Sequence, residues 1–301
     1  MTPEAVLSHP PLILEQSARE AYFRDGFVTC PALIGGQWLE RLTEATSERL
    51  RAARDVASSN DDFDIGPGHG AQHSGVRRLR KVVDQHPTFW SFASSAPMTE
   101  IAADLVGPDV KFHSAKLNFK HPRGGAEIHW HQDIPAWPHT NYSPVTIGVY
   151  LDDVTAEQGP LRLIPGSHRG PLFDHYCDGE WSGRLTGREL EALDTRRAVE
   201  AIGPAGTVVA INCRTVHGSA SNLSSLHRSL LLYVYSSADA FTYTAAPTPT
   251  RYTGAIVRGF PARWSHVDPR PCALPPDWER VGYGSIYSAQ IEDADIASAD
   301  D

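Results

Sequence analysis

Side chains able to bind a metal ion recur at alternate positions in one short segment of the chain. Residues 127–133 read EIHWHQD, which places possible ligands at every second position. On a β-strand, where side chains alternate between the two faces, His129, His131 and Asp133 would share one face. A histidine and a carboxylate two residues apart can then chelate one ion without a bend in the chain.

A third ligand has to come from another part of the chain, and His217 is the candidate. It follows a predicted strand over residues 207–211. Two imidazoles and one carboxylate form the facial triad of non-heme iron(II) oxygenases, which leaves positions for a co-substrate and dioxygen. Glu127 or His129 could replace a member of this triad, and an isolated His-x-Asp also occurs by chance in unrelated proteins.

Arg228, which follows His217 in the chain, is a candidate for binding a carboxylate, a role that a metal site alone would not need. Arg228 follows a polar turn and precedes a predicted strand over residues 229–235, so a hairpin would bring both residues to one cavity. A guanidinium binds a carboxylate in a planar, two-pronged way and keeps its charge. Arg228 therefore suits the distal carboxylate of 2-oxoglutarate, whose keto-acid end would chelate the iron. The simpler alternative is a surface arginine paired with Asp239.

The elements before residue 110 are predicted to be mainly helical. Helices are expected over residues 17–25, 36–56 and 97–106. In the first, Ser17 is a capping-type residue and Gly26 a plausible stop. Residues 58–75 show no periodicity, which predicts a loop that could act as a lid.

From residue 110 the chain changes to short β-type segments. Strands are predicted over residues 110–119, 126–133, 145–151, 161–164, 207–211 and 229–235, with an insertion over 181–198. This order indicates an α+β, mainly β fold, with a jelly-roll (double-stranded β-helix, cupin-like) core and helices outside one sheet. A single domain is expected, with a helical part over 1–109, the jelly roll over 110–240, a C-terminal extension over 241–290 and a flexible tail over 291–301.

Composition restricts the partners. The formal net charge of -9 over 301 residues argues against nucleic-acid binding, and the short basic run at residues 77–81 is expected to be a solvated face or to form a few local ion pairs. The four cysteines form no CxxC pair, so neither a disulfide framework nor a thiolate zinc site is indicated. The absence of a leader-like start and of a long apolar run predicts a cytoplasmic protein without a membrane partner. Nothing indicates an oligomeric state.

Several motifs together resemble the phytanoyl-CoA dioxygenase family of iron(II)- and 2-oxoglutarate-dependent oxygenases. In chain order they are YFRDGFV at 22–28, WHQD at 130–133, GPL at 159–161, IPGSHRG at 164–170, HGS at 217–219 and then Arg228. By this resemblance, Fe(2+) would be bound by His131, Asp133 and His217. The far carboxylate of 2-oxoglutarate would be held by Ser219 and Arg228.

Three further positions refine what the resemblance implies. Lys81 matches a family lysine near the co-substrate. Gly148 stands where the phytanoyl-CoA enzyme itself has a Trp, a departure that speaks against a phytanoyl-CoA substrate. Related halogenases lack the carboxylate of the triad, so Asp133 favours hydroxylation, with O2 consumed and succinate and carbon dioxide released.

The substrate is expected to be a small organic molecule, such as an amino-acid derivative or a natural-product intermediate, because an acidic chain is a poor match for a polyanionic CoA ester. The residues expected to line its pocket are Trp130, Trp137, His139, Asn141 and Tyr142. His168 in the IPGSHRG motif is interpreted as structural. Two other functions remain open, a cupin-like isomerase or lyase with no use for Arg228, and a non-catalytic barrel that binds a small molecule.

Overall fold

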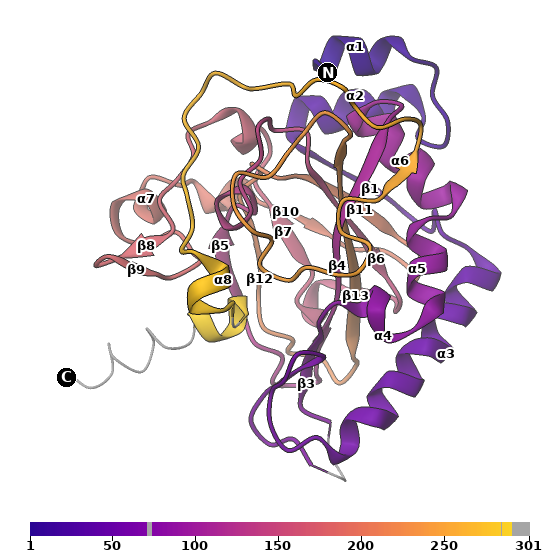
Figure 1. Cartoon of the computed structure of the whole chain (residues 1–301). Coiled ribbons are helices and arrows are strands. Elements are labelled where there is room, and N and C mark those ends of the chain that lie inside the picture. The colour runs from indigo at the N-terminus through magenta and orange to yellow at the C-terminus, as the bar shows by residue number, and fades with distance from the viewer. Residues whose placement is uncertain (71–73, 284, 291–301) are drawn as a thin grey trace.

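Two β-sheets that face each other form the centre of the molecule, with helices outside the larger sheet (Figure 1). The computed structural model describes residues 1–70, 74–283 and 285–290. The larger, 8-stranded sheet has the order β1-β11-β6-β13-β4-β3-β2, with β14 paired to β4. The smaller, 4-stranded sheet has the order β10-β7-β12-β5. The jelly-roll core predicted from the strand pattern is confirmed.

Eight α-helices and five 3-10 turns lie in the described part of the chain. They are α1 (Pro3–Ser8), α2 (Gln16–Asp25), α3 (Gly36–Ala52), α4 (Val82–Gln85), α5 (Pro87–Ala93), α6 (Ala96–Val106), α7 (Gly187–Glu191) and α8 (Trp278–Val281), with 3-10 turns η1 (Ala53–Asp55), η2 (Ile134–Ala136), η3 (Ala156–Gln158), η4 (Ser167–Arg169) and η5 (Thr195–Arg197). Within the described ranges, no helix has the length and apolar character that crossing a membrane requires.

The strands of the larger sheet are β1 (Phe27–Cys30), β2 (Phe63–Ile65), β3 (Val76–Leu79), β4 (Val110–Lys120), β6 (Val145–Tyr150), β11 (Val208–Asn212), β13 (Arg228–Ser237) and β14 (Ile256–Arg258). The smaller sheet contains β5 (Ile128–His131), β7 (Leu161–Leu163), β10 (Val199–Ala201) and β12 (His217–Ser219), and β8 (Tyr176–Cys177) pairs with β9 (Glu180–Trp181).

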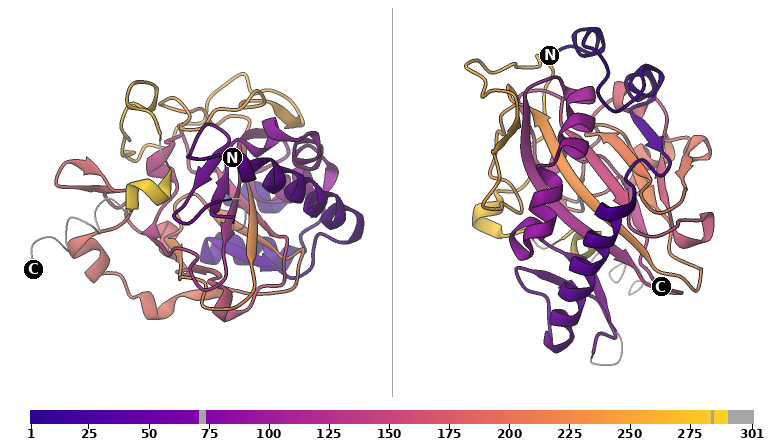
Figure 2. Two further views of the ribbon diagram at one scale, coloured as in Figure 1. Left: turned by 90° about the horizontal axis from the view of Figure 1, so that it is seen from below. Right: turned by 90° about the vertical axis from the view of Figure 1, so that its right-hand side faces the viewer.

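The alternation of side chains along β13 separates an outer core from the interior between the sheets. Tyr233 and Tyr235 point outward, where their hydroxyls donate to the carbonyl oxygens of Phe89 and Ala93 in α5 at 2.9 and 2.7 Å. Leu230, by contrast, belongs to the apolar cluster between the two sheets. Because a strand has a period of two, one strand can fasten the helical layer and also line the interior. Figure 2 shows the helices on one side of this sheet.

A buried ion pair fastens the N-terminal segment to α6. Arg19 and Asp104 are each 1% exposed, and Arg19 Nε lies 3.7 Å from Asp104 Oδ1. The Asp104 carboxylate accepts the backbone N–H groups of residues 12–14 at 2.8–2.9 Å. Arg19 in turn donates to the carbonyl oxygens of Val6, His9 and Asp104. The pair therefore satisfies backbone groups that would otherwise be buried without partners.

The structure corrects two details of the helical part. Helix α2 begins after Glu15 without a side-chain cap, so the predicted capping role of Ser17 is wrong, whereas Gly26 does end the helix with a φ of 86°. Residues 58–75 are not a simple loop, because they contain β2, which pairs with β3. The predicted tail over 291–301 and residues 71–73 of the predicted lid lie outside the described residues.

Replacing Asp104 tests the N-terminal attachment. Asp104→Asn removes the charge that faces Arg19 and turns an amide group toward N–H donors, so the free energy of unfolding should fall by about 3 kcal/mol. Urea unfolding followed by circular dichroism measures the change. Glu100→Gln in the same helix is the control and should stay within about 0.5 kcal/mol of the original protein. Equal stability of both variants would contradict the clamp.

Candidate metal and co-substrate site

The three predicted metal ligands meet between the ends of two neighbouring strands. His131 ends β5 and His217 begins β12, and the two residues are paired directly across the smaller sheet. Their ring centroids are 4.2 Å apart, and His131 Nε2 lies 4.0 Å from Asp133 Oδ1. One possible ligand atom from each of the three residues lies within 4.8 Å of the others. Across the described residues, this is the only such group of three or more found.

Backbone hydrogen bonds set the tautomer of both imidazoles. His131 Nδ1 lies 2.8 Å from the carbonyl oxygen of His129, and His217 Nδ1 lies 2.9 Å from that of Thr215. A carbonyl oxygen can only accept, so each Nδ1 carries the hydrogen and each Nε2 keeps a lone pair. This arrangement, with Nδ1–H bonded to a carbonyl, is the usual support of a metal-binding histidine.

Asp133 reaches the group by a turn rather than by continuing the strand. It has φ −75° and ψ −40°, lies just before η2, and accepts a hydrogen bond on Oδ2 from Thr146 Oγ1 at 2.7 Å. The prediction of one strand over 126–133 is therefore too long. The alternative ligands Glu127 and His129 lie apart from the triad, with half-exposed side chains 3.8 Å from each other.

The local electrostatics suit a cation. Burial, with a further contribution from His217, lowers the pKa of His131 well below its usual value, so this imidazole is neutral at pH 7. Burial alone would raise the pKa of Asp133, but His217 and Lys116 hold it below its usual range. The site therefore presents an ionised carboxylate beside a neutral histidine, as metal coordination requires.

A cavity between the sheets adjoins the triad and contains Arg228. We call it the triad cavity, and its lining includes the triad, Ser219, Arg228, Leu230, Leu232 and Tyr287. Arg228 is 2% exposed, its buried Nε has no hydrogen-bond partner, and it forms no ion pair with a carboxylate in the described ranges. The alternative of a surface pair with Asp239 is wrong, because Asp239 contacts Ser237 and the N-terminal amine.

The path from His217 to Arg228 differs from the predicted hairpin. β12 belongs to the smaller sheet and β13 to the larger sheet, so the two residues reach the triad cavity from opposite sheets. Ser219, the other predicted co-substrate residue, lines the same cavity from β12 and is 5% exposed. A cavity lined by a buried arginine and by three possible metal-ligand atoms has the groups that a chelating dicarboxylate would need.

Lys81 does not reach the triad cavity. Its ammonium lies 3.4 Å from the Asp61 carboxylate, and its side chain lines a neighbouring space, here called the side cavity. The side cavity is lined by Arg78, Arg80, Lys81, Ser114, Ala115, Lys116, Asp133, Trp137, Val234, Pro247, Thr248 and Tyr283. Asp133, Arg78 and Lys116 line both cavities, so the two spaces meet beside the triad.

Sequence reasoning missed several residues of these cavities. The basic run does form local ion pairs, through Arg77, Arg80 and Lys81. Its member Arg78, however, is 3% exposed and lines both cavities. Lys116 and Asn118 point inward from alternate positions of β4, which the predicted strand over 110–119 could have revealed. Tyr287 comes from the C-terminal extension, which carries no motif. Burial, then Arg78, lowers the pKa of Lys116 to about 8.

Of the residues expected to line a substrate pocket, Trp137 alone lines the side cavity. Asn141 and Tyr142 line a separate hollow near the N-terminus. His139 Nδ1 donates to the Trp137 carbonyl oxygen. The ring of Trp130 lies against the Arg162 guanidinium. No described residue of 58–75 lines either cavity.

Two other sequence features have structural explanations. His168 Nε2 donates to the Phe23 carbonyl oxygen at 3.1 Å, which agrees with a structural role. At Gly148 a Cβ would lie 3.0 and 3.2 Å from the methyl groups of Leu230 and Leu232. These two leucines, rather than a tryptophan, therefore wall the triad cavity next to Gly148.

Comparison with known proteins agrees with this geometry. The family model of phytanoyl-CoA dioxygenase (PhyH) matches residues 22–230, most of the chain and all of the predicted metal and co-substrate residues. The chain belongs to the phytanoyl-CoA dioxygenase family. A probable alpha-ketoglutarate-dependent hypophosphite dioxygenase of Stutzerimonas stutzeri is 30% identical over 260 residues, covering 84% of this chain and 88% of the relative.

Other relatives of this family member act on different small molecules. An ectoine dioxygenase of Stutzerimonas stutzeri (strain A1501) is 31% identical, covering 73% of this chain and 76% of the relative. An L-proline trans-4-hydroxylase of Streptomyces griseoviridis is 29% identical, covering 72% and 85%. The crystal structure of EctD from S. alaskensis with 2-oxoglutarate and 5-hydroxyectoine superimposes with a TM-score of 0.67 at 25% identity, covering 89% and 90%. The chain is therefore an iron(II)- and 2-oxoglutarate-dependent dioxygenase.

Thr146 provides a test of the support around the triad. Thr146→Val keeps the shape of the side chain but removes the hydrogen bond to Asp133, so iron(II) should bind about tenfold more weakly. Anaerobic titration with iron(II) measures the dissociation constant. Thr46→Val, in α3 and remote from the site, is the control, because the Thr46 hydroxyl donates only to the Leu42 carbonyl oxygen within the same helix. Unchanged iron affinity in Thr146→Val would show that Asp133 does not depend on this bond.

Proposed function

We propose that His131, Asp133 and His217 bind iron(II) and that Arg228 and Ser219 hold the distal carboxylate of 2-oxoglutarate. The observation that supports this assignment is the buried Arg228 guanidinium, which forms no ion pair with a carboxylate in the described part of the chain and lines the same cavity as the triad. A buried charge of this kind is stable only with an anionic partner. A dicarboxylate that also chelates the metal meets that need.

The reaction divides between the bound groups and the chain. When bound, iron(II) would activate dioxygen, which is the oxidant, and 2-oxoglutarate would supply two electrons as it is converted to succinate and carbon dioxide. The chain orients these groups: Thr146 fixes the carboxylate of Asp133, and two backbone carbonyl oxygens fix the imidazoles. Leu230, Leu232 and Leu161 line the triad cavity with apolar surface that keeps out bulk water.

The substrate is a small organic molecule that binds beside Asp133, on the side of the side cavity, and is hydroxylated. This cavity adjoins Asp133 on one side and is bounded by Trp137 and Val234 on another. Amino-acid derivatives and natural-product intermediates match its mixed polar and apolar lining. The relatives support a small substrate, since their names specify proline, ectoine and hypophosphite.

A metal-dependent isomerase or lyase would keep the triad but leave Arg228 without a role. A barrel that only binds a small molecule would need neither the triad nor Arg228. The buried, unpaired state of Arg228 therefore favours the oxygenase over both alternatives.

The anchor can be tested without turnover. Iron(II) and 2-oxoglutarate, added under argon, should produce the weak visible absorption band of their chelate. Arg228→Ala should weaken 2-oxoglutarate binding by about 2–5 kcal/mol, because it removes the guanidinium that would face a desolvated carboxylate. Titration of the band with 2-oxoglutarate measures the dissociation constant.

Lys81→Ala is the comparison variant, since its ammonium lies outside the triad cavity beside Asp61. Its dissociation constant for 2-oxoglutarate should stay near that of the original protein. If Lys81→Ala weakened binding as much as Arg228→Ala did, the assignment of the anchor would have to change. If no band formed with the original protein, the proposed function itself would fail.

A further inference from the structure

Positive charge predominates in the side cavity. Its lining contains four basic residues, Arg78, Arg80, Lys81 and Lys116, and one acidic residue, Asp133. Asp133 is a member of the triad, so its charge faces the metal. The basic residues therefore need other partners.

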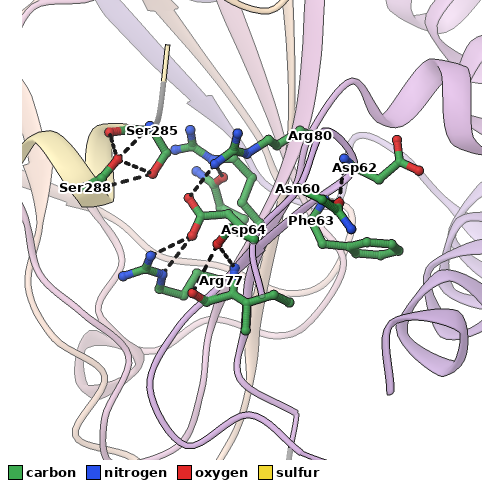
Figure 3. Close-up of polar contacts among 12 residues, drawn as sticks. Asn60, Asp62, Phe63, Asp64, Arg77, Arg80, Ser285 and Ser288 are labelled. Carbon is green, nitrogen blue, oxygen red and sulfur yellow. Dashed lines mark hydrogen bonds and ion pairs between the residues drawn. The ribbon is translucent and has the colours of Figure 1, made fainter. Parts of the chain in front are cut away.

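Two of the four basic residues, Arg80 and Lys81, have carboxylate partners. Arg80 Nη2 lies 3.7 Å from Oδ2 of Asp64, whose Oδ1 accepts from Arg77 at 2.7 Å (Figure 3). Lys81 Nζ lies 3.4 Å from Asp61 Oδ2. Arg80 therefore shares the Asp64 carboxylate with Arg77, and Lys81 lies beside the carboxylate of Asp61.

The other two basic residues, Arg78 and Lys116, form no ion pair with a carboxylate in the described part of the chain. Arg78 is 3% exposed; its Nε donates to Asn118 Oδ1 at 2.8 Å and its guanidinium lies 5.2 Å from the centre of the Tyr287 ring, but its buried Nη2 has no hydrogen-bond partner. Lys116 donates no hydrogen bond to a residue in the described ranges, and Asp133, whose pKa it helps to lower, is not within ion-pair distance. Both side chains line the place where the triad cavity and the side cavity meet.

The co-substrate does not remove this excess. In the loaded site, iron(II), ionised Asp133, doubly charged 2-oxoglutarate and Arg228 together carry no net charge. Arg78 and Lys116 then remain as two positive charges without an ion pair to a described carboxylate in a partly desolvated space, which an anion would stabilise. Trp137 and Val234 form an apolar part of the same lining, against which the carbon skeleton of that anion would pack.

We propose that the substrate is a small organic anion whose carboxylate or other oxyanion group binds to Arg78 and Lys116 beside Asp133. This inference rests on the proposed function. It narrows the substrate class from small organic molecules in general to those with an ionised acid group near the carbon that is oxidised. Arg78 and Lys116 are then specificity-determining residues.

Three probes with the same ring separate charge from shape. Benzoate and phenylphosphonate carry an oxyanion, and benzamide is a neutral analogue of benzoate. Each is titrated under argon into the protein loaded with iron(II) and 2-oxoglutarate, and the change in the chelate band gives the dissociation constant. At least one of the two anions should bind about tenfold or more tightly than benzamide, which corresponds to about 1.4 kcal/mol. Benzoate against phenylphosphonate shows which acid group the site accepts.

Variants of Lys116 and Arg78 test whether these two side chains cause the preference for an anion over benzamide. Lys116→Gln and Arg78→Gln should bring anion and amide close to equal affinity, whereas Lys116→Arg, which keeps the charge, should retain the preference. Lys111→Gln is the control, because Lys111 lies on the same strand but donates to the Ala240 carbonyl oxygen and lines neither cavity. It should bind all three probes as the original protein does.

The outcomes separate this inference from the proposed function. Absence of the chelate band in the original protein would refute the proposed function. A normal band with equal binding of anion and amide, or with no anion binding at millimolar concentration, would refute only the anionic substrate. Loss of 2-oxoglutarate binding in Lys116→Gln and Arg78→Gln would assign these two residues to the co-substrate and also overturn the inference.

Discussion

Burying a guanidinium without an ion pair destabilises a fold, because the charge loses its hydration. In this protein the buried Arg228 lies where a bound anion would restore that lost interaction. The two sheets enclose the side chain at one end of a cavity, and the triad of His131, Asp133 and His217 lies along the same cavity. Burial makes the arginine selective for an anion, because water competes poorly there. The arrangement of both sheets follows from keeping this charge and the metal ligands in one enclosed space.

The rigidity of that space comes from strands with two different faces. β13 fastens α5 through the hydroxyls of Tyr233 and Tyr235 and turns Leu230 and Leu232 toward the cavity. β4 similarly presents Lys116 to the interior. Because each strand is held from outside by helices, the interior side chains keep fixed positions, as a metal site with an oriented co-substrate requires.

Much of this was predictable from local patterns. The strand alternation and the motifs around His131, His217 and Arg228 led to the correct fold class, and the structure places these predicted residues around one cavity. The route of the chain was less predictable: Asp133 lies on a turn, and Arg228 faces His217 from the other sheet, since pairing between distant strands leaves no local signal. The burial of Arg78 was not predictable, because the sequence of a basic run does not indicate which of its members are exposed to solvent and which are enclosed.

The triad cavity is closed by a residue far along the chain. Tyr287 borders it together with Arg228, although β5 and β12, which carry the histidines of the triad, end at residues 131 and 219. Enclosure of the space around Arg228 therefore depends on the C-terminal extension as well as on the two sheets.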